Sequence, residues 1–464
     1  MLFGALGDRW ITLSPIMPIP SRLLVALLVL PLVGCSLLDP EPSDSARGKG
    51  GSTAEPSPTV TALPPVPGGL GPEFFGMHDA DPVGDSWPDA PVGALRVWDS
   101  GVVWNQVETA PGVYDFARLD RIVETARAKK AEVLVVLGQT PAFHSRKPKQ
   151  VGSYGAGAAS MPRLGAWKAY VRAVVERYAA DDVAFQVWNE ANVEGYWRGS
   201  PRQMAKLTAA ARAVLDERPD PPVMVAPAMA TRLLFHRAFF RDFYRQRVGG
   251  RSAADLVDVL AFQLYPLAGG SPKDSIDLLA ATRELLSVEG VDPGKPIWNT
   301  EINYGLEGGE PATPALPERQ QANVATTYLL NAADGVERVY WYSWDLHTIA
   351  DTDLVEADNT TLTPAGRSFG VAQRWMLGTK VESCDASQSG TWTCVLQAPE
   401  GVRRVYWNSG GTSAVRTAFD ATSAEVLGQL AGELPPGGTV LQVGEVPVLV
   451  TSDDSGSSSL PPRL

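Results

Sequence analysis

At 464 residues the chain can hold two domains, or one large barrel with a small partner, and its 44% hydrophobic and 20% charged residues are typical of a globular protein. The net charge of −12, from 40 basic and 52 acidic residues, argues against a polyanion such as nucleic acid as a partner. The 4 His and 3 Cys lack zinc-ligand spacing, so we expect neither a metal site nor a cofactor.

The N-terminal segment has the proportions of a targeting signal. The apolar run LLVALLVLPLVG (23–34) follows Arg22, is short for a membrane span, and is followed by Cys35. The stretch LVGC (32–35) resembles the lipobox of bacterial lipoproteins, in which the cysteine is lipidated and becomes the first residue. The resemblance implies a signal peptide over 1–35 and a lipid anchor on the extracellular face of the cell membrane. The alternative is an ordinary secretory signal and a secreted protein.

Two further segments are too polar to fold. Residues 36–70 are rich in Pro, Gly and Ser and have few large apolar groups, so they predict a disordered tether. The stretch SDDSGSSSLPPRL (452–464) predicts a disordered tail.

Between about 71 and 367, short apolar runs alternate with amphipathic stretches such as 119–130, 167–179 and 204–217, whose apolar residues have helical spacing. The strand candidates are FFGM (74–77), ALRVW (94–98), EVLVVLG (132–138), VAFQVWN (183–189), PVMVAP (222–227), VDVLAFQLY (257–265), PIWNTEI (296–302) and RVYWYSW (338–344). Apolar strands separated by helices predict an α/β fold with a parallel sheet. Eight such units fit a (β/α)8 TIM barrel. A doubly wound open sheet is the alternative, weakened because no Gly-rich phosphate loop follows the first strand.

From about 368 to 451 the runs become short and alternating, and Gly, Asn and Pro interrupt them. This pattern predicts a small antiparallel, sandwich-like β domain. If Cys35 carries lipid, Cys384 and Cys394 remain as a pair in an oxidising compartment. They flank DASQSGTW, which predicts a hairpin turn, so we expect a local disulfide between them.

The active site of such a barrel lies at the C-terminal ends of its strands. Glu190 ends the fourth predicted strand and Glu301 the seventh, and two carboxyl groups can act as acid and nucleophile on an acetal. Aromatic, amide and guanidinium groups that suit a sugar lie at or near the other strand ends: His78, Arg96, Trp98, Asn189, Trp197, Gln263, Tyr265 and Trp344. The alternative is that each Glu caps a loop and that the tryptophans fill gaps. We expect structural or rim positions for Asp99, Glu108, Glu194 and Asp345.

At these residues the chain resembles the clan A glycoside hydrolases. VWNEAN (187–192) is similar to their acid/base motif, with Ala191 in place of proline, and IWNTEIN (297–303) to their nucleophile strand. In DVLAFQLYP (258–266), Gln263 stands where many relatives carry histidine. The nearest resemblance is to glycoside hydrolase family 39 and related bacterial exopolysaccharide endoglycosidases.

The resemblance implies a retaining hydrolase of poly- or oligosaccharides, with Glu190 as acid/base and Glu301 as nucleophile. It also implies that Asn189 reaches the sugar 2-hydroxyl. Tyr265 and Arg96 are expected beside Glu301, where a hydrogen bond and a positive charge would favour its ionised form. We expect a monomer. Two alternatives remain: a catalytically silent carbohydrate-binding lipoprotein, and a transglycosidase that uses the same residues.

Overall fold

The computed structural model describes residues 66–83, 87–179, 183–307, 310–311, 315–347 and 350–453. The predicted signal peptide, Cys35, the tether up to residue 65 and the tail from residue 454 lie outside these ranges. Within them, no helix combines the length and the apolar character needed to cross a membrane.

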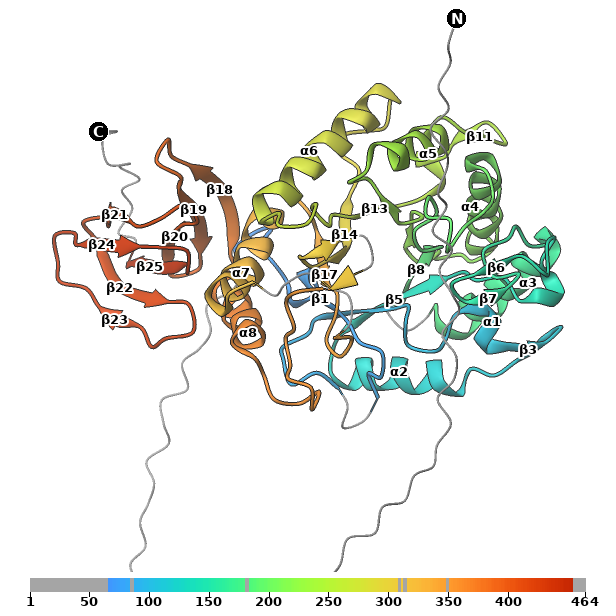
Figure 1. The fold of residues 1–464 in the computed structure, drawn as a ribbon, viewed down its shortest axis with the longest axis horizontal. Coiled ribbons are helices and arrows are strands. Elements are labelled where there is room, and N and C mark those ends of the chain that lie inside the picture. Colours follow the sequence, from blue (N-terminus) through green and yellow to red (C-terminus); the bar gives the residue numbers. More distant parts are fainter. Residues whose placement is uncertain are drawn as a thin grey trace, which may run out of the picture. The chain divides into compact units, whose positions relative to one another are not determined.

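A curled parallel sheet forms the centre of the fold (Figure 1), with strand order β10-β13-β14-β17-β1-β2-β5-β8-β9. All eight strand candidates contribute to it: β1 (Phe75–His78), β2 (Ala94–Val97), β5 (Glu132–Leu137), β8 (Val183–Val187), β9 (Met224–Val225), β13 (Leu260–Gln263), β14 (Ile297–Ile302) and β17 (Arg338–Trp341). The fifth position is split, because β10 (Met229–Ala230) follows β9 and pairs with β13 instead. A parallel bridge joins Val225, on β9 at one end of the sheet, to Val259, just before β13 near the other end, so the expected barrel is confirmed.

Helices cover the outside of this sheet (Figure 1). They are α1 (Trp104–Val107), α2 (Ala117–Ala128), α3 (Leu164–Tyr178), α4 (Pro201–Leu215), α5 (Leu234–Tyr244), α6 (Pro272–Val288), α7 (Pro317–Ala333) and α8 (Pro364–Met376). Their sequences explain where they begin and what they bury. The Ser200 hydroxyl accepts the amide hydrogen of Gln203 and caps α4, with Pro201 in the first turn. In α3, Trp167, Val171, Val174 and Tyr178 recur at helical spacing and are buried.

Shorter elements decorate the loops between the strands and helices. The hairpin pairs are β3 (Glu108–Ala110) with β4 (Val113–Tyr114), β6 (Val151–Gly152) with β7 (Gly155–Ala156), β11 (Arg247–Val248) with β12 (Arg251–Ser252), and β15 (Leu306–Glu307) with β16 (Glu310–Pro311). The 3-10 turns are η1 (Pro72–Phe74), η3 (Ala142–His144) and η4 (Ala254–Leu256).

The C-terminal region is antiparallel, as expected. Its main sheet has the order β18-β19-β20-β25-β22-β23, and β21 pairs with β24. The bounds are β18 (Lys380–Ala386), β19 (Thr391–Ala398), β20 (Gly401–Asn408), β21 (Ser413–Arg416), β22 (Ala421–Val426), β23 (Gly432–Glu433), β24 (Val440–Val443) and β25 (Val448–Asp453). Cys384 and Cys394 lie opposite each other on β18 and β19 and form the expected disulfide.

Three described segments lie across or next to the expected domain boundaries. The border at residue 368 falls inside α8, which packs on α7 and buries Phe369 and Trp375, so α8 belongs to the helical layer of the barrel. The last residues of the predicted tether are also held. The amide of Leu70 donates to the carbonyl oxygen of Thr379 at 2.8 Å, because an extended segment pairs with the loop after α8. β25 continues to Asp453, past the expected start of the tail.

Candidate active site

A cavity of about 280 Å³ lies at the C-terminal ends of the strands and contains both predicted carboxyl groups. Glu190 lies just after β8 and Glu301 is near the end of β14. The lining residues are Trp98, Asp99, Asn189, Glu190, Val193, Tyr196, Ala230, Arg232, His236, Gln263, Tyr265, Glu301 and Tyr342. Six of the predicted site residues therefore share one cavity: Trp98, Asn189, Glu190, Gln263, Tyr265 and Glu301.

Arg96, on β2, lies beneath this cavity and is completely buried. One of its terminal nitrogens, Nη1, donates to Glu301 Oε1 at 2.6 Å, and Nη2 donates to Asn189 Oδ1 at 2.7 Å. Its Nε donates to Gln186 Oε1 at 2.7 Å. A planar guanidinium held at three corners has little freedom, so Arg96 fixes both Glu301 and Asn189.

Glu301 has a donor on each carboxylate oxygen. Besides Arg96 on Oε1, the Tyr265 hydroxyl donates to Oε2 at 3.1 Å. Burial raises the pKa of Glu301, and the charge of Asp99 adds to this, whereas Arg96 and Tyr265 lower it. Hydrogen bonds to the charged form favour ionisation, so Arg96 and Tyr265 make Glu301 the better anion of the pair.

Glu190 has the opposite environment. Among the described residues, no side chain or backbone amide donates a hydrogen bond to its carboxyl group, and it is not part of an ion pair. Burial, followed by the negative charge of Glu301, raises the pKa of Glu190 to about 8, although Arg232 and Arg96 oppose the shift. Two neighbouring carboxyl groups whose environments separate their pKa values are the usual mark of an acid and a base.

The backbone around Glu190 is strained. Trp188 has a φ of 65° and Glu190 a φ of 42°, and left-handed non-glycine residues cost of order 1–3 kcal/mol each. The amide of Ala191 donates to the carbonyl oxygen of Ala228 at 3.0 Å, which helps to hold this loop. The motif's usual proline at residue 191 has no amide hydrogen and could not make this bond. The departure from the motif therefore has a structural use in this chain.

The amide of Asn189 is oriented by two donors. Its Oδ1 accepts from Arg96 and also from Gln263 Nε2 at 2.9 Å. The Asn189 Nδ2 group is therefore the end left to donate into the cavity. Gln263, in the place of the family's histidine, supplies one of these two bonds, and its buried Oε1 has no partner among the described residues.

Besides Arg96, which lies beneath the cavity, three expected sugar contacts do not line it. Trp197 is buried against Trp188, with ring centroids 4.9 Å apart, and Trp344 is 2% exposed. His78 Nε2 lies 3.1 Å from Arg96 Nη1 and 3.0 Å from the carbonyl oxygen of Thr300. Burial lowers the pKa of His78 well below its ordinary value, so it is neutral and supports Arg96 from below. The structure gives all three residues packing positions.

Several residues that line the cavity were not among the predicted site residues. Asp99, expected at a rim or structural position, lies in the wall and accepts a hydrogen bond from the Tyr342 hydroxyl at 2.7 Å and another from Tyr154. Arg232 follows β10, the second piece of the fifth strand, which the predicted run 222–227 did not include. Tyr342 lies inside the eighth predicted strand, two residues before the expected contact Trp344. Because side chains alternate along a strand, the pattern places both on the same face and does not distinguish them.

The described ranges contain no group of three or more His, Cys, Asp or Glu side chains that could hold a metal ion. The arrangement offers acid, base, nucleophile and hydrogen-bonding chemistry from side chains of the chain itself.

Solved structures with the same fold are glycoside hydrolases. One is a family 39 glycoside hydrolase from the gut symbiont Bacteroides cellulosilyticus WH2, at 16% identity and a TM-score of 0.63, covering 82% of each chain. A family 39 β-xylosidase from Caulobacter crescentus has 15% identity and a TM-score of 0.61, covering 85% of this chain and 98% of its own. A GH30 endoxylanase from Clostridium papyrosolvens C71 has 14% identity and a TM-score of 0.55, covering 83% and 98%.

No model of a protein family matches the chain, and neither does any curated protein. At 14–16% identity the likeness to these solved structures establishes the barrel fold. Function has to be argued from the cavity.

Proposed function

We propose that the chain is a retaining glycoside hydrolase that cleaves O-glycosidic bonds in a poly- or oligosaccharide by double displacement. The main support for this proposal is that one cavity contains two carboxyl groups, Glu190 and Glu301, in different environments. Glu301 is paired with Arg96 at 2.6 Å, and Glu190 has a pKa raised to about 8. The family 39 glycoside hydrolases among the solved structures with the same fold support a glycan substrate.

In the first step, Glu190 gives its proton to the glycosidic oxygen while a Glu301 oxygen attacks the anomeric carbon. The carbon–oxygen bond breaks, the leaving sugar departs as an alcohol, and a glycosyl ester of Glu301 remains. Asn189 donates from Nδ2 to the 2-hydroxyl, where contacts tighten as the ring approaches an oxocarbenium ion. Arg96 and Tyr265, which hydrogen-bond the Glu301 carboxylate, keep the ester in the same place.

In the second step Glu190 acts as the base. The negative charge of Glu301 is one cause of the high pKa of Glu190, and the ester removes that charge. The pKa of Glu190 therefore falls, and its carboxylate takes a proton from water, which attacks the anomeric carbon and releases Glu301. Two inversions at one carbon leave its configuration retained.

We further propose that the enzyme works as a monomer on the extracellular face of the cell membrane, anchored by lipid on Cys35. The lipobox order of the N-terminal residues supports this, and the proline-rich segment after Cys35 would serve as a spacer. In the native host, Cys35→Ala should move the protein from the membrane to the soluble fraction. A variant that fractionates with the membrane as the wild type does would contradict the anchor.

The activity is tested with a panel of soluble polysaccharides and aryl glycosides, with products resolved by mass spectrometry. Glu301→Gln should abolish turnover of every substrate that the wild type cleaves. The matched control is Glu194→Gln, a carboxylate on the same loop as Glu190 whose side chain is 80% exposed, and it should keep wild-type rates. Normal rates for Glu301→Gln on a cleaved substrate would contradict the assignment. Products longer than the substrate would identify a transglycosidase.

A further inference from the structure

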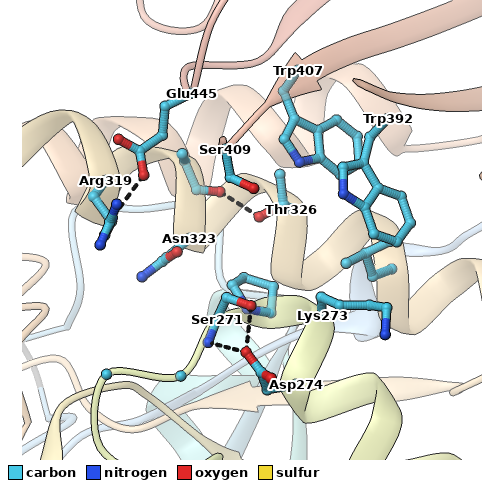
Figure 2. Close-up of a pocket in the computed structure, with 15 residues that line it drawn as sticks. Ser271, Lys273, Asp274, Arg319, Asn323, Thr326, Trp392, Trp407, Ser409 and Glu445 are labelled. Carbon is cyan, nitrogen blue, oxygen red and sulfur yellow. Dashed lines mark hydrogen bonds and ion pairs between the residues drawn. The ribbon is translucent and has the colours of Figure 1, made fainter. Parts of the chain in front are cut away.

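A second cavity, of about 260 Å³, lies between the β region, the first turn of α6 and one face of α7 (Figure 2). Figure 2 shows Trp392 and Trp407 on one side and Ser271, Lys273 and Asp274 on the other. The residues that α7 contributes, Arg319, Ala322, Asn323, Thr326 and Leu330, share one face of that helix. The cavity is therefore bounded by regular elements on two sides.

The two tryptophans form a parallel aromatic pair. They lie opposite each other on β19 and β20, with ring centroids 5.4 Å apart and planes within 1°. Trp392 is only partly buried, and neither indole N–H donates a hydrogen bond to any described residue. Neither N–H is among the enclosed groups of the described chain that lack a partner, so these two donors and the partly exposed ring of Trp392 are available to a ligand.

The opposite wall of the cavity contains a further polar group that is free to bind a ligand. Asn323 is 7% exposed, and its side-chain amide makes no hydrogen bond with the described part of the chain. The cations of the wall are already paired, Arg319 with Glu445 at 2.7 Å and Lys273 with Asp277. The third charged group, Asp274, accepts hydrogen bonds from the amide and the hydroxyl of Ser271. An acidic ligand would therefore meet a carboxylate and two occupied cations in this wall, whereas apolar faces and hydroxyl groups of a ligand find partners. A neutral sugar ring has this chemistry.

A third cavity, of about 490 Å³, borders both this cavity and the active site. It shares Arg232 with the cavity of Glu190 and Glu301, and it shares Gly269, Gly270 and Asp274 with the tryptophan cavity. The loop 264–271 after β13 borders all three. In a barrel, the first turns of the helices lie on the same face as the C-terminal ends of the strands, so the part of the tryptophan cavity that the first turn of α6 lines is on the face that carries the active site.

We propose that the three cavities form one glycan-binding track, which leads from Glu190 and Glu301 across the loop 264–271 to Trp392 and Trp407. The track holds several units of a neutral polysaccharide at once, with a distal unit packed on Trp392 and hydrogen-bonded by Asn323. This inference rests on the proposed glycosidase function and names its substrate class as long, uncharged glycan chains. It also gives the β region a part in substrate binding.

The test compares Trp392→Ala with the wild type on two substrates: the neutral polysaccharide that the wild type cleaves fastest, and the 4-nitrophenyl monoglycoside of the same sugar. We expect kcat/KM on the polymer to fall by about tenfold through KM, the loss typical of a tryptophan contact. The monoglycoside does not reach Trp392, so its kcat/KM should not change. Trp392→Phe should recover part of the loss. The control, Phe419→Ala, removes an aromatic side chain that is 83% exposed in the same region and should change neither value.

Each other outcome decides the question. Equal polymer kinetics for Trp392→Ala and the wild type, or equal losses on both substrates, would overturn the track. If the wild type cleaves monoglycosides but no neutral polymer, the track is also overturned, but the proposed hydrolase activity stands. If neither substrate is cleaved, the hydrolase assignment fails, and the track is then tested by measuring polysaccharide binding. In affinity gels that contain xylan, galactomannan or mixed-linkage β-glucan, retardation of the wild type but not of Trp392→Ala supports it, and no retardation overturns it.

Discussion

Arg96 donates a 2.6 Å hydrogen bond to Glu301, whereas Glu190, in the same cavity, receives none from the described residues. This difference, together with the Tyr265 hydroxyl on Glu301, separates two chemically identical groups into an anion and a proton carrier. The chain obtains two functions from one residue type by placing a single buried cation beside one of them.

Arg96→Met should therefore remove activity and also destabilise the fold. It leaves the buried carboxylate of Glu301 without its cation, and breaking such a pair typically costs about 3–5 kcal/mol. Urea unfolding and kcat/KM on an aryl glycoside measure both effects. Arg172→Met removes a pair on the surface, with Glu217, and should change neither. Wild-type stability in Arg96→Met would contradict the role of the ion pair.

The activity should decline on the alkaline side near pH 8. Glu190 must be protonated for the first step, and its pKa is raised to about 8. The charge of Arg232 lowers this pKa, so Arg232→Met should move the alkaline limb of kcat/KM to higher pH. Arg198→Met, a partly exposed arginine that does not line the cavity, should leave the limb in place. If the pH of the alkaline limb in Arg232→Met is the same as in the wild type, or lower, the assignment of this limb to Glu190 is contradicted.

Glu190→Gln should be more stable than the wild type at neutral pH. The folded-state pKa of Glu190, about 8, lies above its ordinary value of 4.5, so the native state binds the proton more tightly than the unfolded chain. This contribution to stability is complete below the ordinary value and is lost as the pH rises through about 8. Glutamine carries no charge to bury. The gain in Tm over wild type should grow between about pH 5 and 8, and a gain that shrinks over this range would contradict the shift.

The disulfide between Cys384 and Cys394 should stabilise the β region without supporting catalysis. The two cysteines are 10 residues apart, and closing so short a loop is worth about 2–3 kcal/mol. Replacing both by serine should lower the midpoint of urea unfolding and leave kcat on an aryl glycoside unchanged. Peptide mapping without reductant should find the two cysteines joined. Free thiols in the folded protein would contradict the pairing.

The strands and the carboxyl pair could be predicted from the sequence because both depend on local patterns. Apolar runs between amphipathic stretches identified all eight strand positions. Glu190 and Glu301 follow or end such runs, so the strand ends brought them together. The split of the fifth strand depends on pairing with two different neighbours, β8 and β13, which no local pattern contains. Arg232, which follows the second piece, was missed for that reason.

The direction in which a side chain points also could not be predicted from the sequence. Trp197 and Trp344 are large and lie near strand ends, but packing places both in the core, whereas Tyr342 and Asp99 face the cavity. The tryptophan cavity depends on residues from α6, α7, β19 and β20, which are far apart in the sequence. Only the folded chain brings these elements together.

The most direct test of the central claim is the anomer that the wild-type enzyme releases first. Proton NMR of a reaction on an aryl glycoside, recorded in the first minutes before mutarotation, distinguishes the two anomers. With Glu301 as nucleophile, the first product has the configuration of the substrate, as two successive displacements require. A first product of inverted configuration would contradict a covalent intermediate on Glu301 and, with it, the proposed mechanism.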